Sequence, residues 1–213
     1  MSVFGLVMHR ERAKALALDA IEWLGSRGHE VRLLAEDGIA LGLPELGMPA
    51  EKIAIGADLI LSFGGDGTML RAVELATQEH VPVLGINLGQ LGYLTEVEPA
   101  GLRMALKRFL SGSYTLEERL RVHVVTTRKN GGVEHHDALN EVVIEKSQMG
   151  RTVRLDVDLD GRPFTTYVCD GLILATPTGS TAYAFSVRGP IIDPRHRAIL
   201  MAPVAAHMLF DRS

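Results

Sequence analysis

Residues 64–68 read Gly-Gly-Asp-Gly-Thr and carry the clearest chemical pattern in the sequence. Glycines have no Cβ, so backbone N–H groups in this stretch can approach a phosphate closely. A carboxylate such as Asp66 would repel a phosphate, so it indicates a second task. Asp66 could hold a metal ion or accept a proton from an attacking hydroxyl. The structural alternative is a glycine-rich turn in which Asp66 or Thr68 caps a helix.

A second polar stretch, residues 176–183, reads Thr-Pro-Thr-Gly-Ser-Thr-Ala-Tyr and follows the apolar run 172–175. Its hydroxyls and backbone amides can bind a sugar or a phosphate, and Tyr183 offers a flat face to a base. Asn140-Glu141 lies within an otherwise apolar segment. An amide beside a carboxylate can hydrogen-bond both a sugar diol and a base amino group. Taken alone, the 176–183 stretch favours an unusual polar turn.

Two other groups favour structural explanations. His135-His136-Asp137 contains metal-binding residue types, but no second cluster has a compatible spacing, which favours a solvated strand end. Cys169 has no evident histidine partner and is interpreted as a small buried residue.

The first half of the chain predicts an α/β arrangement that would position Asp66. Apolar runs predict strands over 3–7, 29–34, 58–63 and 81–86, and helical spacing marks 11–23 and a helix from Met69 to about 79–80. Residues 35–50 are expected to form an irregular connection. Strands that alternate with helices indicate a mainly parallel sheet, whose ligands bind at the carboxyl ends of the strands. Asp66 and the segment 87–93 would both lie at that edge.

The second half changes to the two-residue period of strands. A helix over 102–110 and the turn 111–113 precede two predicted hairpins. The first joins 120–128 to 133–146 through Asn-Gly-Gly, and the second joins 153–159 to 162–168 through Asp-Gly. We therefore expect residues 1–98 to form an α/β domain, and residues 99–213 to form a helix followed by a mostly antiparallel, sandwich-like β domain.

Composition restricts the class of protein. The chain has 213 residues, 46% of them apolar, and a formal net charge of -4 with scattered basic residues, which argues against nucleic-acid binding. A single cysteine excludes an internal disulfide, and no apolar run approaches the roughly 18 residues of a membrane span. Because the N-terminus lacks the basic leader and long apolar core of a secretory signal, we expect a cytoplasmic protein with no membrane partner.

The last residues also carry a prediction. A strand expected at 199–201 is followed by the apolar stretch 202–210, and then by Asp-Arg-Ser with no closing element. A sheet that ended there would leave edges and apolar surface exposed, so we expect that Ser213 is not the natural end of the polypeptide.

The motifs at 64–68, 140–141, 170–171 and 176–183, in this order and at this spacing, together resemble the NAD kinase family. Diacylglycerol and sphingosine kinases share Gly-Gly-Asp-Gly-Thr, and phosphofructokinase has a similar loop, but those families lack the later hydroxyl-rich stretch. The resemblance extends over essentially the whole chain from Val3 and includes Gly-Ile-Asn at 85–87 and residues 89–94.

The resemblance implies an α/β domain and a β domain with the active site between them. The implied reaction transfers the terminal phosphate of ATP, with polyphosphate as an alternative donor, to the adenosine 2′-hydroxyl of NAD, with Mg²⁺ or another divalent cation. It implies a homodimer or homotetramer as well. The alternatives are a lipid or sugar kinase that shares the loop, or a non-catalytic dinucleotide sensor. Asp66 argues against the sensor, because phosphate binding needs no carboxylate.

The resemblance also implies roles for individual residues. Asp66 would be the catalytic base, and the donor phosphates would lie against Gly64, Gly65, Gly67 and Thr68. The implied NAD-binding residues are Asp66, Gly67, Arg71, Tyr93, Asn140, Glu141, Arg151, Asp170, Thr181, Ala182, Tyr183 and Ser186. The metal ligands stay unknown, since no dedicated protein cage is evident. Two departures are Cys169, where the family commonly has a small residue such as alanine, and Arg188, where it often has glycine.

Overall fold

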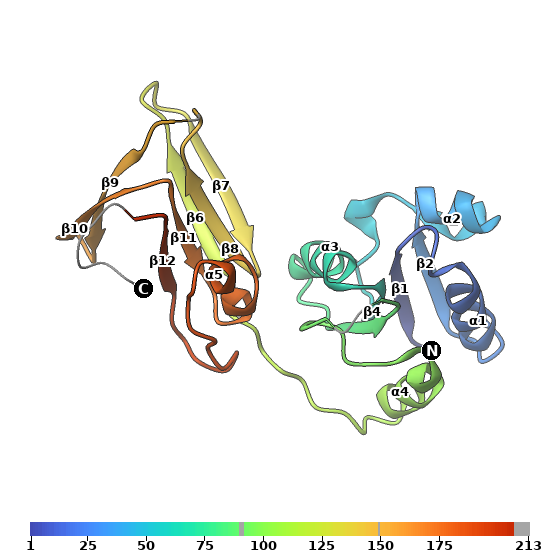
Figure 1. The fold of residues 1–213 in the computed structure, drawn as a ribbon. Helices are drawn as coiled ribbons and strands as arrows, with labels where there is room; N and C mark the ends of the chain where they lie inside the picture. Colours follow the sequence, from blue (N-terminus) through green and yellow to red (C-terminus); the bar gives the residue numbers. More distant parts are fainter. Residues whose placement is uncertain (90–91, 149, 207–213) are drawn as a thin grey trace. The chain divides into compact units, whose positions relative to one another are not determined.

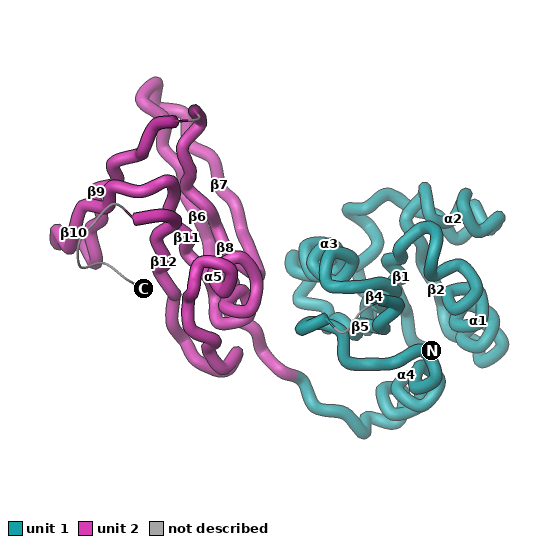
Figure 2. Tube along the Cα trace, viewed as in Figure 1, with its two compact units in different colours: residues 1–116 teal, residues 117–213 magenta. Residues whose placement is uncertain are grey.

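The computed structural model describes residues 1–89, 92–148 and 150–206. The chain divides into two compact units, residues 1–116 and 117–213 (Figure 2). The prediction that Ser213 is not the natural end of the polypeptide rests partly on residues 207–213, which lie outside the described residues. No helix among the described residues is both long and apolar enough to cross a membrane.

Unit 1 is built on a five-stranded sheet in which every pair of neighbours is parallel. The strand order is β3-β2-β1-β4-β5. Figure 1 shows β1 between β2 and β4. The strands are β1 (Val3–Met8), β2 (Glu30–Leu34), β3 (Gly47–Met48), β4 (Leu59–Gly64) and β5 (Val83–Asn87). Every residue of β4 is buried, as expected for a central strand covered on both faces.

The helices of unit 1 are α1 (Lys14–Gly25), α2 (Ala35–Leu41), α3 (Asp66–Thr77) and α4 (Leu102–Leu110), with short 3₁₀ turns at Pro44–Leu46, Ala50–Lys52 and Pro99–Gly101. Successive side chains of a strand point to opposite faces, so β4 contributes to two cores. Leu61 and Phe63 pack in one cluster with Trp23 of α1, whereas Ile60 packs in another with Ala72 of α3. This two-sided packing produces the predicted parallel α/β arrangement.

The prediction that residues 35–50 form an irregular connection is wrong. The segment contains α2 and the edge strand β3, which pairs with Leu33 and Leu34 of β2. The helix is short and interrupted by Gly38, so its period is weak in the sequence. Gly38 is required by packing, because an added Cβ would lie 3.0 Å from the carbonyl oxygen of Leu43.

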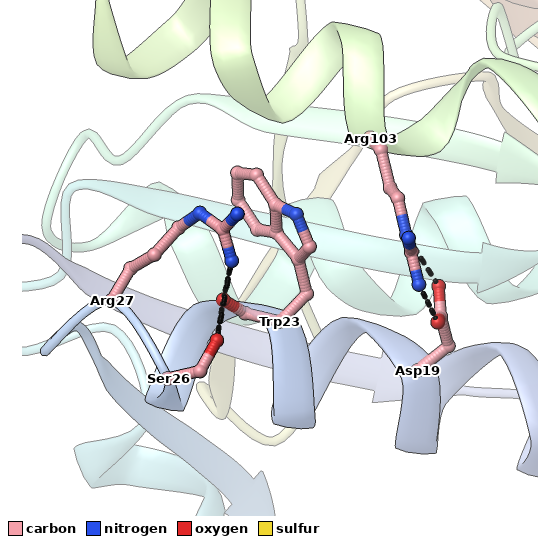
Figure 3. A network of polar contacts seen from close by, with 5 residues as sticks. All are labelled: Asp19, Trp23, Ser26, Arg27 and Arg103. Carbon is pink, nitrogen blue, oxygen red and sulfur yellow. Dashed lines mark hydrogen bonds and ion pairs between the residues drawn. The ribbon is translucent and has the colours of Figure 1, made fainter.

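Helix α4 belongs to unit 1, which places the division later than the predicted boundary at residues 98 and 99. Leu102 and Leu106 are buried in the same cluster as Trp23. Figure 3 shows a second link, in which the guanidinium of Arg103 donates hydrogen bonds to both carboxylate oxygens of Asp19 on α1. Helical spacing predicted the helix itself, but its packing partner lies far away in the sequence.

Unit 2 consists of small antiparallel sheets. Its strands are β6 (Val122–Thr127), β7 (Val133–Ala138), β8 (Glu141–Glu145), β9 (Val153–Leu159), β10 (Arg162–Cys169), β11 (Gly171–Ala175) and β12 (Leu200–Val204). The pairs are β6 with β7, β9 with β10, and β12-β11-β8 in a three-stranded sheet (Figure 1). Both predicted hairpins form, and the fold class predicted for the two parts of the chain is confirmed.

The predicted strand over 133–146 is in fact two strands. β7 ends at Ala138 and β8 begins at Glu141 in a different sheet, with Leu139 and Asn140 between them. The carbonyl oxygens of Leu139 and Asn140 accept hydrogen bonds from Thr176, one from its hydroxyl and one from its N–H. The apolar run continues through this break because Leu139 is itself buried.

Candidate functional site

Asp66 is the first residue of α3, directly after the carboxyl end of β4. Its two carboxylate oxygens accept hydrogen bonds from the N–H groups of Tyr93, at 3.2 Å, and Leu94, at 3.1 Å. The segment that carries these donors follows β5 and leads to Val97, which pairs with Ile86 of β5 in parallel and donates its N–H to the carbonyl oxygen of Gly85. The carboxylate, which follows β4, is therefore held by backbone from the segment that follows β5, as expected for a group that must keep one position.

A pocket of about 330 Å³ is lined by His9, Arg12, Gly64, Gly65, Leu88 and Gly89, and Gly65 directly precedes Asp66 in the chain. Hydrogen bonds beyond the strand ends place these residues together: the N–H of His9 bonds to Phe63 and the N–H of Leu88 bonds to Gly64. The pocket therefore lies at the carboxyl ends of β1, β4 and β5, where ligands of parallel sheets bind.

The predicted phosphate loop lies partly in this pocket. Gly64 and Gly65 line it, whereas Gly67 and Thr68 are in the first turn of α3. An added Cβ on Gly64 would lie 2.2 Å from Thr68 Oγ1, so glycine is needed for the tight entry into the helix. The N-terminus of α3 directs its positive dipole end to this loop, which favours an anion.

Two basic side chains of the pocket, His9 and Arg12, were missed in the sequence. They follow β1, the first strand of the parallel sheet, and so emerge at the same edge as the glycine loop. The signal that could have identified them is the run His-Arg-Glu-Arg at 9–12, directly after a predicted strand. Arg12 is exposed and suits a phosphate, with which a guanidinium makes paired hydrogen bonds.

Arg71 and Tyr93, two of the implied NAD-binding residues, both follow Asp66 in the sequence. The Arg71 guanidinium forms an ion pair with Glu36 of α2 at 2.5 Å, and this pair lowers the pKa of the Glu36 carboxyl. Arg71 therefore connects α3 to α2. The Tyr93 side chain is 66% exposed and available to a ligand.

In unit 2, Asn140 and the hydroxyl-rich stretch lie together. Gly179 packs so closely on Asn140 that an added Cβ would lie 2.0 Å from the Asn140 carbonyl oxygen. The buried Thr176 hydroxyl accepts a hydrogen bond from the N–H of Gly179 at 3.0 Å. Ser180 is buried as well, and its hydroxyl accepts a hydrogen bond from the N–H of Ile192. Thr176 and Ser180 thus shape the loop.

Glu141 begins β8 opposite Ala175, the last residue of β11, so it reaches the same loop. Burial raises the pKa of its carboxyl, and a hydrogen bond from the backbone of Tyr183 partly offsets that effect. One of its oxygens, Oε2, is buried without a hydrogen-bond partner among the described residues. A buried acceptor of this kind is costly unless a ligand supplies a donor.

The other residues implied in this loop are accessible. Thr181 and Ala182 are half-buried, and Tyr183 and Ser186 are exposed. Tyr183 and Ser186 are the first and last residues of the short helix α5 (Tyr183–Ser186), which follows the 3₁₀ turn Thr178–Thr181. Arg188 has a φ of 69°, the left-handed region that glycine enters easily. At position 188 the backbone therefore adopts a conformation that favours glycine, although the residue is arginine.

Asp170 and Arg151 lie apart from this group. Asp170 precedes Gly171, the residue of β11 that pairs with Glu145, whereas Glu141 pairs at the opposite end of β11. The Asp170 carboxylate accepts an ion-pair contact from Lys146 Nζ at 2.7 Å. Arg151 is exposed in the connection between β8 and β9. The structure thus places Asp170 at one end of a strand and Asn140 with Glu141 at the other.

No group of three or more histidine, cysteine, aspartate or glutamate side chains able to hold a metal occurs among the described residues. Asp66, beside the glycine loop, is a carboxylate of the type that binds Mg²⁺ together with water and the phosphates of a nucleotide.

Comparison with known proteins decides the family. The model of the ATP-NAD kinase N-terminal domain matches residues 4–114, and that of the ATP-NAD kinase C-terminal domain matches residues 139–213. The chain belongs to the NAD kinase family. Its members phosphorylate NAD with ATP, and the resemblance drawn from the motifs is confirmed.

Relatives of the NAD kinase family match nearly the whole chain. An NAD kinase of Moorella thermoacetica is 40% identical over all of this chain and 68% of its own length. NAD kinase 2 of Streptomyces coelicolor is 41% identical over 97% of this chain and 71% of its own length. The chain thus spans about two thirds of the length of these relatives.

Two solved structures have the same fold. The crystal structure of yeast NADH kinase complexed with NADH superposes with a TM-score of 0.91, at 24% identity, over all of this chain and 68% of that one. An NAD kinase from Archaeoglobus fulgidus in complex with ATP gives a TM-score of 0.76, at 26% identity, over 99% of this chain and 75% of that one. The two-part fold of this chain is therefore that of the NAD kinases.

Proposed function

We propose that the protein transfers the terminal phosphate of ATP to the adenosine 2′-hydroxyl of NAD, with Asp66 as the base. The observation that carries this proposal is the Asp66 carboxylate, held by two backbone N–H groups beside a pocket of glycine amides and basic side chains. A carboxylate next to a phosphate pocket suits a kinase better than a simple binding protein.

Unit 1 would bind the phosphate donor. The N–H groups of Gly64 and Gly65, the N-terminus of α3 and the side chains of His9 and Arg12 all favour negatively charged oxygens. Gly67 and Thr68 would complete this phosphate site from the first turn of α3. These groups recognise a phosphate chain, so inorganic polyphosphate is a second donor to test.

Unit 2 would bind the adenosine part of NAD. Glu141 has an unpartnered buried oxygen that can accept a hydrogen bond from an amino group or a ribose hydroxyl, and Asn140 precedes it. Tyr183, exposed at the same loop, can stack on the base. Thr181, Ala182 and Ser186 would line the same pocket. Arg71, Tyr93, Arg151 and Asp170 are proposed as further NAD contacts.

In the reaction, the 2′-oxygen forms a bond to the terminal phosphorus while the bond from that phosphorus to the bridging oxygen breaks and ADP leaves. Each Asp66 oxygen that accepts a backbone N–H retains a further lone pair, so the carboxylate can take the hydroxyl proton. A divalent cation such as Mg²⁺, bound to the donor phosphates, would neutralise the charge that develops there. Alignment and charge neutralisation should account for most of the acceleration.

The test is an assay of the purified protein with NAD, Mg²⁺ and ATP that measures NADP. Parallel reactions replace ATP by polyphosphate, replace NAD by a diacylglycerol or a sugar, or add a chelator. We expect phosphate transfer to NAD but not to the diacylglycerol or the sugar, and loss of activity with the chelator. Binding of NAD without any NADP would instead support a dinucleotide sensor. Sedimentation at micromolar concentration tests the proposed homodimer or homotetramer.

A further inference from the structure

The hairpin of β6 and β7 carries a histidine cluster that the kinase reaction does not use. In its register His123 pairs with Asp137, and Val125 pairs with His135. Alternate residues of a strand share a face, so His123, His135 and Asp137 lie on one face of the hairpin. His136 lies on the opposite face. The sequence showed only the run at 135–137, and the fold adds His123 from the neighbouring strand.

These three side chains form a chain of polar contacts. His123 Nδ1 lies 2.8 Å from Asp137 Oδ1, and His123 Nε2 lies 3.3 Å from His135 Nδ1. The two imidazole rings are tilted by 31°, with centroids 5.5 Å apart. Arg121 Nη2 lies 3.7 Å from the other Asp137 oxygen.

The contact with Asp137 determines which His123 nitrogen can bind a ligand. An ionised carboxylate only accepts hydrogen bonds, so the proton of a neutral His123 lies on Nδ1. The Nε2 lone pair then points to His135 Nδ1. A carboxylate that orients an imidazole in this way is the usual outer partner of a metal-binding histidine.

The distance between the two nitrogens fits a tetrahedral ion. Two nitrogens bound to zinc at about 2.0–2.1 Å with a tetrahedral angle are about 3.3–3.4 Å apart. The observed separation of His123 Nε2 and His135 Nδ1 is 3.3 Å. We propose that these two nitrogens bind a divalent transition-metal ion, zinc above all, with Asp137 as a positioning residue.

The site would be open. The described residues contain no group of three or more metal-binding side chains, so two ligands come from the protein and water completes the shell. The His123 side chain is 55% exposed, so water can reach an ion bound to it. Imidazole is a good ligand for zinc, copper and nickel and a poor one for magnesium, so this site is distinct from a site for the magnesium ion that accompanies ATP. Both nitrogens must be unprotonated to bind the ion.

The experiment is zinc titration by calorimetry of the metal-free full chain at pH 7.5, in the absence of nucleotide. Single variants His123→Gln and His135→Gln remove one ligand each. His136→Gln is the matched control, because it removes a neighbouring imidazole from the opposite face. Asp137→Asn tests the positioning role. Circular dichroism and the NADP-forming activity confirm that each variant is folded.

We expect His123→Gln and His135→Gln each to weaken zinc binding at least about tenfold, and Asp137→Asn to weaken it about 10- to 100-fold. His136→Gln should leave it within about twofold. In nitrogen-15 spectra of the wild-type protein, zinc should shift His123 Nε2 while Nδ1 keeps its proton, and Asp137→Asn should lose this preference. Unchanged binding in both ligand variants, or an equal loss in His136→Gln, would overturn the proposal.

Discussion

Gly92 lies against the carboxylate of Asp66, and an added Cβ on Gly92 would be only 2.3 Å from Asp66 Oδ1. The next two residues donate the N–H groups that hold this carboxylate. Glycine at this position therefore permits the close approach of backbone to the proposed base.

Gly92→Ala should displace Asp66 without unfolding unit 1. A methyl group in that space pushes the carboxylate or the backbone by a large fraction of an ångström, and such misplacement can cost about 100-fold in rate. We expect the kcat for NADP formation to fall by about this factor. Gly25→Ala is the control, since its Cβ would meet nothing within 4 Å. Equal rates in the two variants would show that the contact with Gly92 is dispensable.

Asp66→Asn should lower kcat by about two to four orders of magnitude, because the amide cannot accept the hydroxyl proton. The KM for NAD should change little. Asparagine also places an NH₂ group opposite one of the two backbone donors, so the loop at 93–94 should loosen. Glu74→Gln, an exposed change on the same helix, is the control. Near-normal kcat at saturating substrates would exclude Asp66 as the base.

Asn140→Ala and Glu141→Ala should each raise the KM for NAD by about 10- to 100-fold, as expected for lost hydrogen bonds to a polar ligand. The KM for ATP should move less. The backbone contact of Asn140 with Thr176 survives the change, so the loop should persist. Glu145→Ala, exposed at the far end of β8, should behave as wild type. A defect confined to ATP would assign the pair to the donor instead.

Asp37 should make the stability of unit 1 depend on pH. Its side chain is fully buried on α2, and burial raises the pKa of its carboxyl. The folded state therefore binds this proton more tightly than the unfolded chain. The resulting stabilisation is complete below the unfolded pKa of about 3.9, and it is lost as the pH rises through the higher folded value.

Asp37→Asn should remove this dependence, because the amide does not titrate. Trp23, the single tryptophan of the chain, is buried in the core of unit 1 and reports its unfolding in urea. We expect the urea midpoint of wild type to fall relative to that of the variant as the pH rises above about 4. A constant difference between the two midpoints across this range would contradict the assignment.

The strands and helices with strong periodic patterns could be predicted from the sequence, and so could the residues whose types are chemically unusual. Gly-Gly-Asp-Gly-Thr was readable because strand, turn and helix start are all local there. The Asn-Gly-Gly and Asp-Gly turns predicted their hairpins for the same reason, as glycines at 131 and 161 adopt positive φ. The family followed from the order and spacing of several such motifs.

Only the tertiary structure decided the contacts between residues that lie far apart in the chain. The hold of the 92–94 backbone on Asp66, the meeting of Arg12 with the glycine loop, and the pairing of His123 with Asp137 are examples. No local pattern encodes these partners, because each depends on which strands become neighbours and on their register. That choice is made by burial of the apolar faces over the whole unit, which fixes the distances on which the proposed chemistry depends.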